Sequence, residues 1–424
     1  MFSKHLRTEA IAGLTTFFTM SYIVVVNPSI LAAPGTGMPF SGVMTATVLL
    51  SSAMTLLMGL YAQLPFAVAP GMGINAFFAY TVILGQHVPW PAALGIIFWS
   101  GLLFVLVSAT GIREMIARAI PPGLRTAAAA GIGLFLTFIG LKNAGLVIGD
   151  PVTLVRFGPL GATSCLSIAG LGLSTWLLSR KSPFAFLGGI FAVSLAAWAG
   201  GLVKAPDVLF SAPDFSSVFL KLDIMGALKL SLLPAILSIF FTDLFDSIST
   251  FIGVSQAAGL LDKEGNPLRL REGLIVDALA TLCAGLLGTS SGTAYIESSA
   301  GIEAGGRTGL TSVFTALCFL PCLFLAPLAG MVPAYATAPV LILVGALMFR
   351  SVARLSFDKL EDIVPAFLTI VLIPLTFSIT QGILWGFISH VGLYLMAGRR
   401  REIPPMLYGL AAVSLGLLAL ARAV

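Results

Sequence analysis

Five acidic residues fall within or at the ends of long apolar stretches of the sequence. They are Asp243, Asp246, Asp277, Glu297 and Glu303. An acidic side chain at the centre of a membrane helix costs about 3 kcal/mol on insertion, so such residues face a polar interior and mark ligand or proton pathways. Basic residues are nearly absent from the same stretches, and a buried carboxyl group without a counter-ion favours its neutral form. These side chains are therefore suited to accepting hydrogen bonds from a ligand and to carrying protons.

The first two acids belong to one polar seam. Asp243 and Asp246 lie three residues apart in the segment 241–250, so they share one face of a helix with several hydroxyl side chains. For Asp243, a structural role as an acceptor of backbone N–H groups in a broken span stands beside a functional one. Asp246 and Glu297 are the stronger candidates for binding a ligand.

The other two acids have simpler structural interpretations. Asp277 lies near the start of a predicted span at 273–289, where an aspartate commonly caps a helix. Glu303 lies close to Arg307, which favours an ordinary ion pair at the membrane interface.

Two breaks interrupt the apolar stretches. The segment 64–75 contains two prolines and two glycines, and the segment 288–301 is rich in Gly, Ser and Thr. Each predicts an extended piece followed by a half-helix. Backbone at membrane depth must be hydrogen-bonded or line a cavity, so paired breaks predict a substrate site near the midplane, faced by the N–H groups of two helix N-termini. The alternative is a pair of packing kinks, or of ordinary helix ends in re-entrant loops.

The elements that must position these groups are membrane-spanning helices. Of the 424 residues, 58% are hydrophobic and only 10% are charged, whereas a soluble domain carries about 25% charged residues. Fourteen spans are predicted, seven on each side of a polar stretch at 204–224. They cover 11–32, 42–62, 66–85, 90–111, 120–141, 160–179, 183–203, 226–254, 273–289, 292–306, 308–331, 336–352, 362–379 and 380–397. The apolar run 403–421 is left open as a fifteenth span or a surface helix.

Charge and internal similarity indicate how the spans are arranged. With the N-terminus in the cytoplasm, the inner loops carry seventeen Lys and Arg and the outer loops five, which favours this orientation in a cell membrane. Residues 17–19 are identical to 240–242, and three of the four residues at 73–76 recur at 301–304. The two offsets, 240 − 17 = 223 and 301 − 73 = 228, are nearly equal. An odd number of spans in each half then inverts the second half relative to the first.

Several other functions are disfavoured by the sequence. His5, His87 and His390 fall in separate regions and cannot form a metal cluster in this topology. No nucleophile constellation and no glycine-rich phosphate loop is present, so we expect no enzyme and no ATPase. The net charge of +5 is too modest to indicate a nucleic-acid partner. We expect ion-driven transport without a cofactor, and a homodimer is left open.

Five motifs match one known family. They lie at 13–20, 69–76, 243–246, 295–301 and 305–310. In these motifs, and almost from end to end, the sequence resembles the AzgA-like purine permeases, a branch of the nucleobase and ascorbate transporter superfamily. The resemblance implies an all-α polytopic membrane protein with fourteen transmembrane segments in two inverted seven-span repeats, and with short extended stretches in spans three and ten.

The resemblance also implies two domains. Spans one to four (1–112) and eight to eleven (223–333) correspond to a core domain. Spans five to seven (113–222) and twelve to fourteen (334–398) correspond to a gate domain, and 399–424 is a C-terminal basic stretch with an extra apolar helix.

The implied cargo is adenine, guanine or hypoxanthine, carried inward with protons that supply the energy. By motif, the residues assigned to the substrate are Asn75, Asp243, Asp246, Glu297, Ile296, Ser298, Gly73 and Phe77. Those assigned to proton coupling are Asp246, Glu297, Asp243 and Asp277. A neutral purine offers N–H donors to carboxylates, acceptors to half-helix N–H groups, and a flat face to an aromatic ring such as Phe77 or Tyr295.

Two alternative kinds of cargo fit the site residues less well. Uracil and xanthine relatives follow the acid or amide of the tenth span with Asn, whereas this sequence has Ser298 there. An anion transporter of the sulfate type, which shares the fold by resemblance, would place carboxylates against an anion and repel it.

Overall fold

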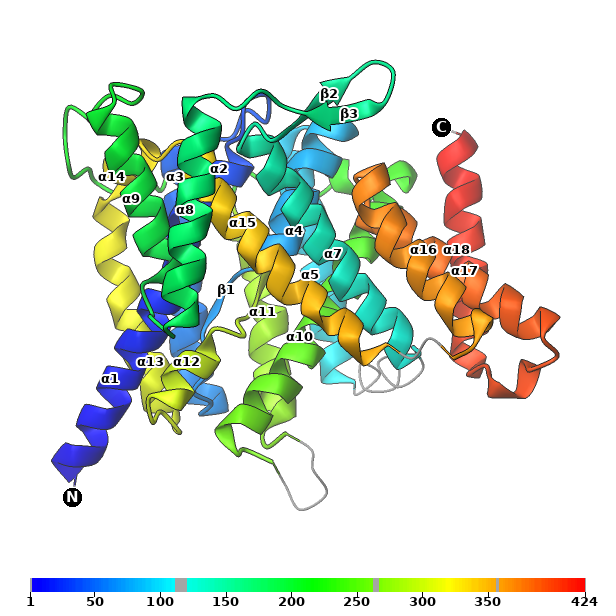
Figure 1. Ribbon diagram of the computed structural model, residues 1–424. Coiled ribbons are helices and arrows are strands. Elements are labelled where there is room, and N and C mark those ends of the chain that lie inside the picture. The colour runs from blue at the N-terminus through cyan, green and yellow to red at the C-terminus, as the bar shows by residue number, and fades with distance from the viewer. Residues whose placement is uncertain (1, 111–119, 262–266, 356–357, 424) are drawn as a thin grey trace.

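The computed structural model describes residues 2–110, 120–261, 267–355 and 358–423 (Figure 1). The predicted domain limit at 112–113 lies outside these ranges. The first half contains α1 (Phe2–Met20), α2 (Ile23–Leu31), α3 (Phe40–Leu57), η1 (Met58–Ala62), β1 (Val68–Pro70), α4 (Met72–Ala76), η2 (Phe77–Gly85), α5 (Trp90–Ala109), α7 (Pro122–Asn143), β2 (Val147–Asp150), β3 (Leu154–Phe157), α8 (Ala162–Ser179) and α9 (Ala185–Ala199).

The second half repeats this order of long helices around a short strand. It contains η3 (Gly226–Leu228), η4 (Leu230–Leu232), α10 (Leu233–Ala258), α11 (Leu270–Leu287), β4 (Gly292–Ala294), α12 (Ser298–Glu303), α13 (Gly309–Phe319), η5 (Leu320–Phe324), α14 (Ala326–Gly330), α15 (Ala334–Phe349), η6 (Arg350–Arg354), α16 (Leu360–Thr376), α17 (Ile379–Met396), η7 (Arg400–Glu402) and α18 (Pro405–Ala423).

The predicted helical membrane fold is confirmed. Eight helices in the described ranges are long and apolar enough to cross a membrane, and shorter apolar helices accompany them. Helical segments occupy the predicted spans of both halves, and the two predicted extended stretches form β1 and β4. These strands pair antiparallel, so the half-helices α4 and α12 that follow them run in opposite directions. An inverted repeat requires this arrangement.

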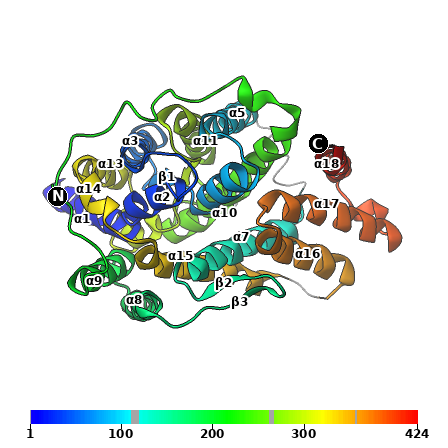
Figure 2. The same ribbon diagram turned by 90° about the horizontal axis from the view of Figure 1, so that it is seen from above.

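Glycines let the central helices approach closely. A Cβ added at Gly101 of α5 would lie 2.4 Å from the backbone nitrogen of Leu282 in α11, and one added at Gly133 of α7 would lie 2.6 Å from the carbonyl oxygen of Gly345 in α15. Small residues at such crossings allow backbone-to-backbone packing in membranes. In the view from above, α1, α3, α5, α11 and α13 gather on one side, and α7, α8, α9, α15 and α16 line the other (Figure 2).

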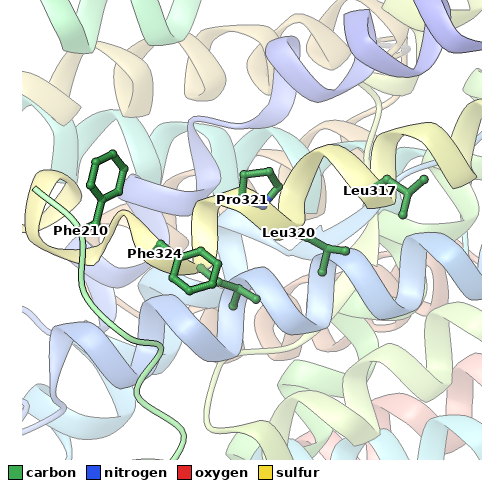
Figure 3. A pocket seen from close by; sticks show the side chains of 6 residues that line it. Phe210, Leu317, Leu320, Pro321 and Phe324 are labelled. Atoms are coloured by element: carbon green, nitrogen blue, oxygen red, sulfur yellow. The ribbon is translucent and has the colours of Figure 1, made fainter.

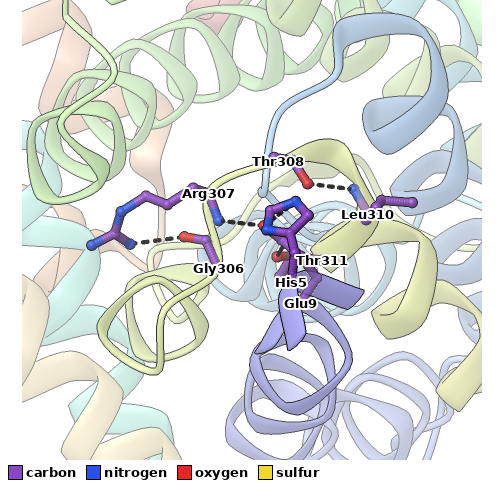
Figure 4. A network of polar contacts seen from close by, with 7 residues as sticks. All are labelled: His5, Glu9, Gly306, Arg307, Thr308, Leu310 and Thr311. Atoms are coloured by element: carbon purple, nitrogen blue, oxygen red, sulfur yellow. Dashed lines mark hydrogen bonds and ion pairs between the residues drawn. The ribbon is translucent and has the colours of Figure 1, made fainter. Parts of the chain in front are cut away.

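A polar network ties the start of α1 to the corner between α12 and α13 (Figure 4). The carboxylate of Glu9, which is 1% exposed, accepts hydrogen bonds from the Thr311 hydroxyl and from the backbone N–H of Arg307. The Arg307 guanidinium donates to the carbonyl oxygen of Ile302 at 2.5 Å, near the C-terminal end of α12, where a cation is favourable. The network therefore anchors the half-helix α12 at its C-terminal end.

The predicted ion pair between Glu303 and Arg307 is wrong. Arg307 turns to backbone carbonyls instead, because the last carbonyl groups of α12 need donors. Glu303 lies 3.9 Å from Lys181, and both side chains are largely exposed, so this contact stabilises the fold little.

The end of α13 and the following η5 present an apolar surface (Figure 3). An open groove is lined by Phe210, Leu317, Leu320, Pro321, Leu323 and Phe324. Such a surface on a spanning helix is suited to lipid contact. At the other edge, α18 packs beside α17 and is seen end-on from above (Figure 2). It therefore runs in the direction of the spans, as a fifteenth span would.

Candidate functional site

The site is built around the two short strands β1 and β4, which lie side by side as an antiparallel pair and each lead into a half-helix. Val68 pairs with Ala294 and Pro70 with Gly292. Beyond the strands, the N–H of Gly71 donates to the carbonyl of Ser291 at 2.8 Å, and the N–H of Tyr295 donates to the carbonyl of Ala67 at 2.9 Å. This pairing satisfies backbone groups that lipid could not.

Side-chain hydroxyls form hydrogen bonds with further backbone N–H and carbonyl groups at and beside β1. Thr55 Oγ1 accepts the N–H of Val68 at 2.9 Å and donates to its carbonyl at 3.0 Å. Ser298 Oγ accepts the N–H of Ala67 at 3.0 Å, and the Ser298 side chain is fully buried. The hydroxyl predicted to contact substrate is thus directed towards the strand pair, where it holds the start of α12 in place.

Glu297 stands immediately before the first residue of α12 and is partly exposed. Its Oε1 accepts a hydrogen bond from the hydroxyl of Tyr22 at 2.7 Å. The neighbouring Ile296 is 61% exposed. Glu297 and Ile296 therefore border an accessible space at the beginning of the half-helix.

Asp246 projects from α10 towards the same place. It is partly exposed, and it lies close enough to Asp277 and Glu297 for their charges to interact with it. Within the described ranges its carboxyl group accepts no hydrogen bond, and neither Asp246 nor Glu297 forms an ion pair with a basic residue. The two side chains that the sequence favoured as ligands are therefore brought together at partly exposed positions.

An exposed strip continues along α10 from Asp246. Ser249, Gly253 and Gln256 are exposed, and their spacing of three, seven and ten residues from Asp246 places them on one face of the helix. Asp246 therefore lies at one end of a strip that reaches the C-terminal end of α10.

Asp277 does not cap a helix, so that interpretation is wrong. The helix α11 begins at Leu270, and Asp277 lies within it, fully buried. Its Oδ1 accepts the N–H of Ala294 in β4 at 2.9 Å, and its Oδ2 accepts the Ser247 hydroxyl. Asp277 thus joins the second strand to α10, next to Asp246.

Asp243 is also buried and is bound by hydroxyl groups. Its Oδ2 accepts hydrogen bonds from Thr281 at 2.5 Å and from Ser291 at 2.7 Å. These partners lie on α11 and at the entrance of β4. These two donors are side-chain hydroxyls, whereas the structural interpretation from the sequence expected backbone N–H groups.

Of the residues predicted on the first half-helix and its continuation η2, Asn75 and Phe77 are buried and Gly73 is partly exposed. Asn75 Oδ1 accepts a hydrogen bond from the hydroxyl of Ser290, which lies just before β4. A Cβ added at Gly73 would lie 2.4 Å from Cγ2 of Ile132, so this glycine lets α4 pack against α7. Phe77 is 1% exposed. Its stacking on a ligand stays a prediction.

Sequence reasoning missed Tyr22, which supplies the hydrogen bond to Glu297. The available signal was a tyrosine within an apolar span, because a buried phenol usually has a hydrogen-bond partner. Tyr295, 5% exposed, donates its own hydroxyl to the carbonyl of Pro70 at 2.5 Å. The arrangement as a whole offers carboxylate acceptors beside two phenols, which suits the recognition of a neutral ligand that carries N–H groups.

Some known proteins are similar to this chain in sequence, and others are similar in fold alone. A model described as a permease family matches residues 7–385. The adenine permease AdeP of Escherichia coli is 44% identical over 400 residues, covering 94% of this chain and 89% of that protein. The guanine/hypoxanthine permease PbuG of Bacillus subtilis is 40% identical over 420 residues, covering 96% and 95%. The transmembrane domain of the cyanobacterial bicarbonate transporter BicA has the same fold, with a TM-score of 0.67 at 14% identity over 90% of this chain and 97% of that one. The chain therefore belongs to this permease family, as its motifs predicted.

Proposed function

We propose that the protein takes up purine nucleobases, namely adenine, guanine or hypoxanthine, together with protons. The observation that carries the proposal is the pair of partly exposed carboxyl groups, Asp246 and Glu297, at the meeting point of two half-helices. Membership of a permease family makes the chain a transporter and not an enzyme. Relatives named as adenine and guanine/hypoxanthine permeases support the choice of cargo.

A purine fits this chemistry in its neutral form. Its N–H groups donate to Glu297 and Asp246. Its ring nitrogens, and in guanine and hypoxanthine also the carbonyl oxygen, accept from backbone N–H groups at the first turn of a half-helix. An anion such as bicarbonate, the cargo of BicA by name, would meet two carboxylates at short range and be repelled. The shared fold therefore does not extend to a shared cargo.

Proton coupling is proposed for the same two side chains. Asp246 and Glu297 form no ion pair within the described ranges, and each carries a proton when neutral. With Asp243 and Asp277 already bound by hydroxyl or backbone donors, we assign the principal proton carriers to Asp246 and Glu297.

The proposed mechanism is alternating access in a cell membrane, with the N-terminus in the cytoplasm. The residues predicted for the core domain carry the half-helices, and those predicted for the gate domain pack beside them. Rocking of one against the other exposes the site to each side in turn. The exposed strip of α10 from Asp246 to Gln256 is then the route from the site to the cytoplasm.

A disulfide between the proposed domains is expected to stop transport. Ser238 of α10 donates to Thr380 of α17 at 2.6 Å between oxygens, so a cysteine at each position places two sulfurs within reach. In a variant whose four native cysteines are replaced by alanine, oxidation of the Ser238→Cys, Thr380→Cys pair should abolish purine uptake, and a reductant should restore it. Each single cysteine under the same oxidation is the control. Efficient cross-linking with undiminished uptake would exclude rocking at this interface.

Uptake of radiolabelled bases into proteoliposomes tests the proposed function. Adenine, guanine and hypoxanthine are each offered with a pH gradient, acid outside, and protein-free liposomes give the background. We expect uptake of one or more of these purines and much weaker uptake of xanthine, uracil and bicarbonate. A preference for xanthine, uracil or bicarbonate would contradict the proposal.

A further inference from the structure

Tyr22 connects the proposed substrate site to a helix of the predicted gate domain. Its side chain is fully buried. The hydroxyl donates to Glu297 Oε1 at 2.7 Å. The ring lies edge-on against Phe186 of α9, with 4.9 Å between ring centroids and an interplanar angle of 62°. One side chain thus contacts both the start of α12 and the start of α9.

The backbone around Tyr22 fixes where this side chain begins. Tyr22 lies in a tightened turn between α1 and α2, where its carbonyl accepts the N–H groups of Val25 at 3.1 Å and Val26 at 2.9 Å. One turn earlier, Phe18 contacts Phe184, with 4.6 Å between ring centroids. The first span and the start of α9 therefore meet at two aromatic pairs, and Phe186 limits the positions open to the Tyr22 ring.

We propose that Tyr22 is a positioning residue for Glu297, and that Phe186 sets the position of Tyr22. The inference deepens the proposed function, on which it rests. By occupying Oε1, the Tyr22 hydroxyl orients the carboxylate so that Oε2 is presented to an N–H group of the base. Because Phe186 belongs to α9, a movement of α9 relative to the first span alters the support of Glu297 and hence the affinity of the site.

The size of the effect follows from conformational entropy. A glutamate side chain has several rotatable bonds, and ordering it on binding lowers affinity when it is not already held. The hydroxyl of Tyr22 restricts Glu297 before the base arrives. Its removal leaves the carboxylate in place but mobile, so binding weakens without the loss of a direct contact to the base.

The test compares Tyr22→Phe with the wild-type protein in purine uptake and in equilibrium binding of the same base. We expect KM and Kd to rise by about 3-fold to 10-fold, with a maximal rate per folded transporter within about two-fold of wild type. The matched control is Tyr335→Phe, because the Tyr335 hydroxyl has no hydrogen-bond partner within the described ranges. A lower maximal rate at unchanged KM would mean that Tyr22 is merely structural and would overturn the proposal.

A double-variant cycle tests the part of Phe186. Phe186→Leu removes the ring contact and keeps the hydroxyl, and it should raise KM in the same direction. Because both changes act through one hydrogen bond, the double variant Tyr22→Phe, Phe186→Leu should be no weaker than Tyr22→Phe alone. If the KM increases of the two single variants multiply in the double variant, Phe186 does not act through Tyr22, and this part of the proposal is refuted.

The same assays separate this inference from the proposed function. Glu297→Gln is measured beside the Tyr22 variants. If Glu297→Gln weakens binding while Tyr22→Phe keeps wild-type KM and Kd, only the inference about Tyr22 fails. If Glu297→Gln also binds purine as wild type does, Glu297 is not a ligand, and the proposed site fails with it.

Discussion

Glu297→Gln is expected to weaken purine binding by about 10-fold to 150-fold, because a hydrogen bond to a charged group contributes about 1.5 to 3 kcal/mol. The contacts of Glu297 make this change unusually informative. The Tyr22 hydroxyl donates to one carboxylate oxygen, so in the glutamine variant it holds the amide oxygen. The amide NH₂ then faces the base, and a donor meets a donor. The measurement is equilibrium binding of radiolabelled purine to purified, folded protein.

Glu303→Gln is the matched control for this experiment. Glu303 lies six residues further along the chain, it is largely exposed, and its contact with Lys181 spans 3.9 Å. The same change of charge there should leave purine affinity near that of wild type. Wild-type affinity in Glu297→Gln would remove Glu297 from the site.

Collapse of the proton gradient is expected to abolish accumulation of purine. A membrane potential of 100 mV supplies about 2.3 kcal/mol for each proton carried with a neutral base, which supports roughly fifty-fold accumulation with one proton. A protonophore should therefore reduce the ratio of internal to external purine in energised vesicles from tens to about one. The measurement is the steady-state ratio of radiolabelled base with and without the protonophore.

Replacement of sodium distinguishes the two coupling ions. Exchange of external sodium for potassium, with the potential clamped, should leave the accumulation ratio unchanged. Accumulation that survives the protonophore and disappears without sodium would assign coupling to sodium instead of protons.

The sequence predicted the broad plan of the molecule because that plan depends on short-range physical rules. The lengths of the apolar stretches predicted the spans. Two prolines and two glycines in the segment 64–75 predicted the extended stretch that contains β1. The three-residue spacing of Asp243 and Asp246 placed both on one helix. The resemblance in motif then supplied the family, which the comparisons confirm.

The contacts between distant segments were beyond sequence patterns. Nothing local to Asp277 indicates that it accepts the N–H of Ala294, or that Tyr22 reaches Glu297 across 275 residues. Such partners depend on how spans pack in three dimensions. The incorrect pairing of Glu303 with Arg307 has the same origin. The two residues are close along the chain, but the Arg307 guanidinium donates to a carbonyl oxygen of α12 instead of contacting Glu303.

The position of a bound purine tests the proposed site most directly. A structure of the protein with adenine, guanine or hypoxanthine bound should place the base between the start of α12 and Asp246 of α10. A ring N–H of the base should lie about 2.7 to 3.2 Å from a carboxylate oxygen of Glu297, the usual range for a hydrogen bond. A base bound away from both half-helices, with Glu297 contacting only protein, would contradict it.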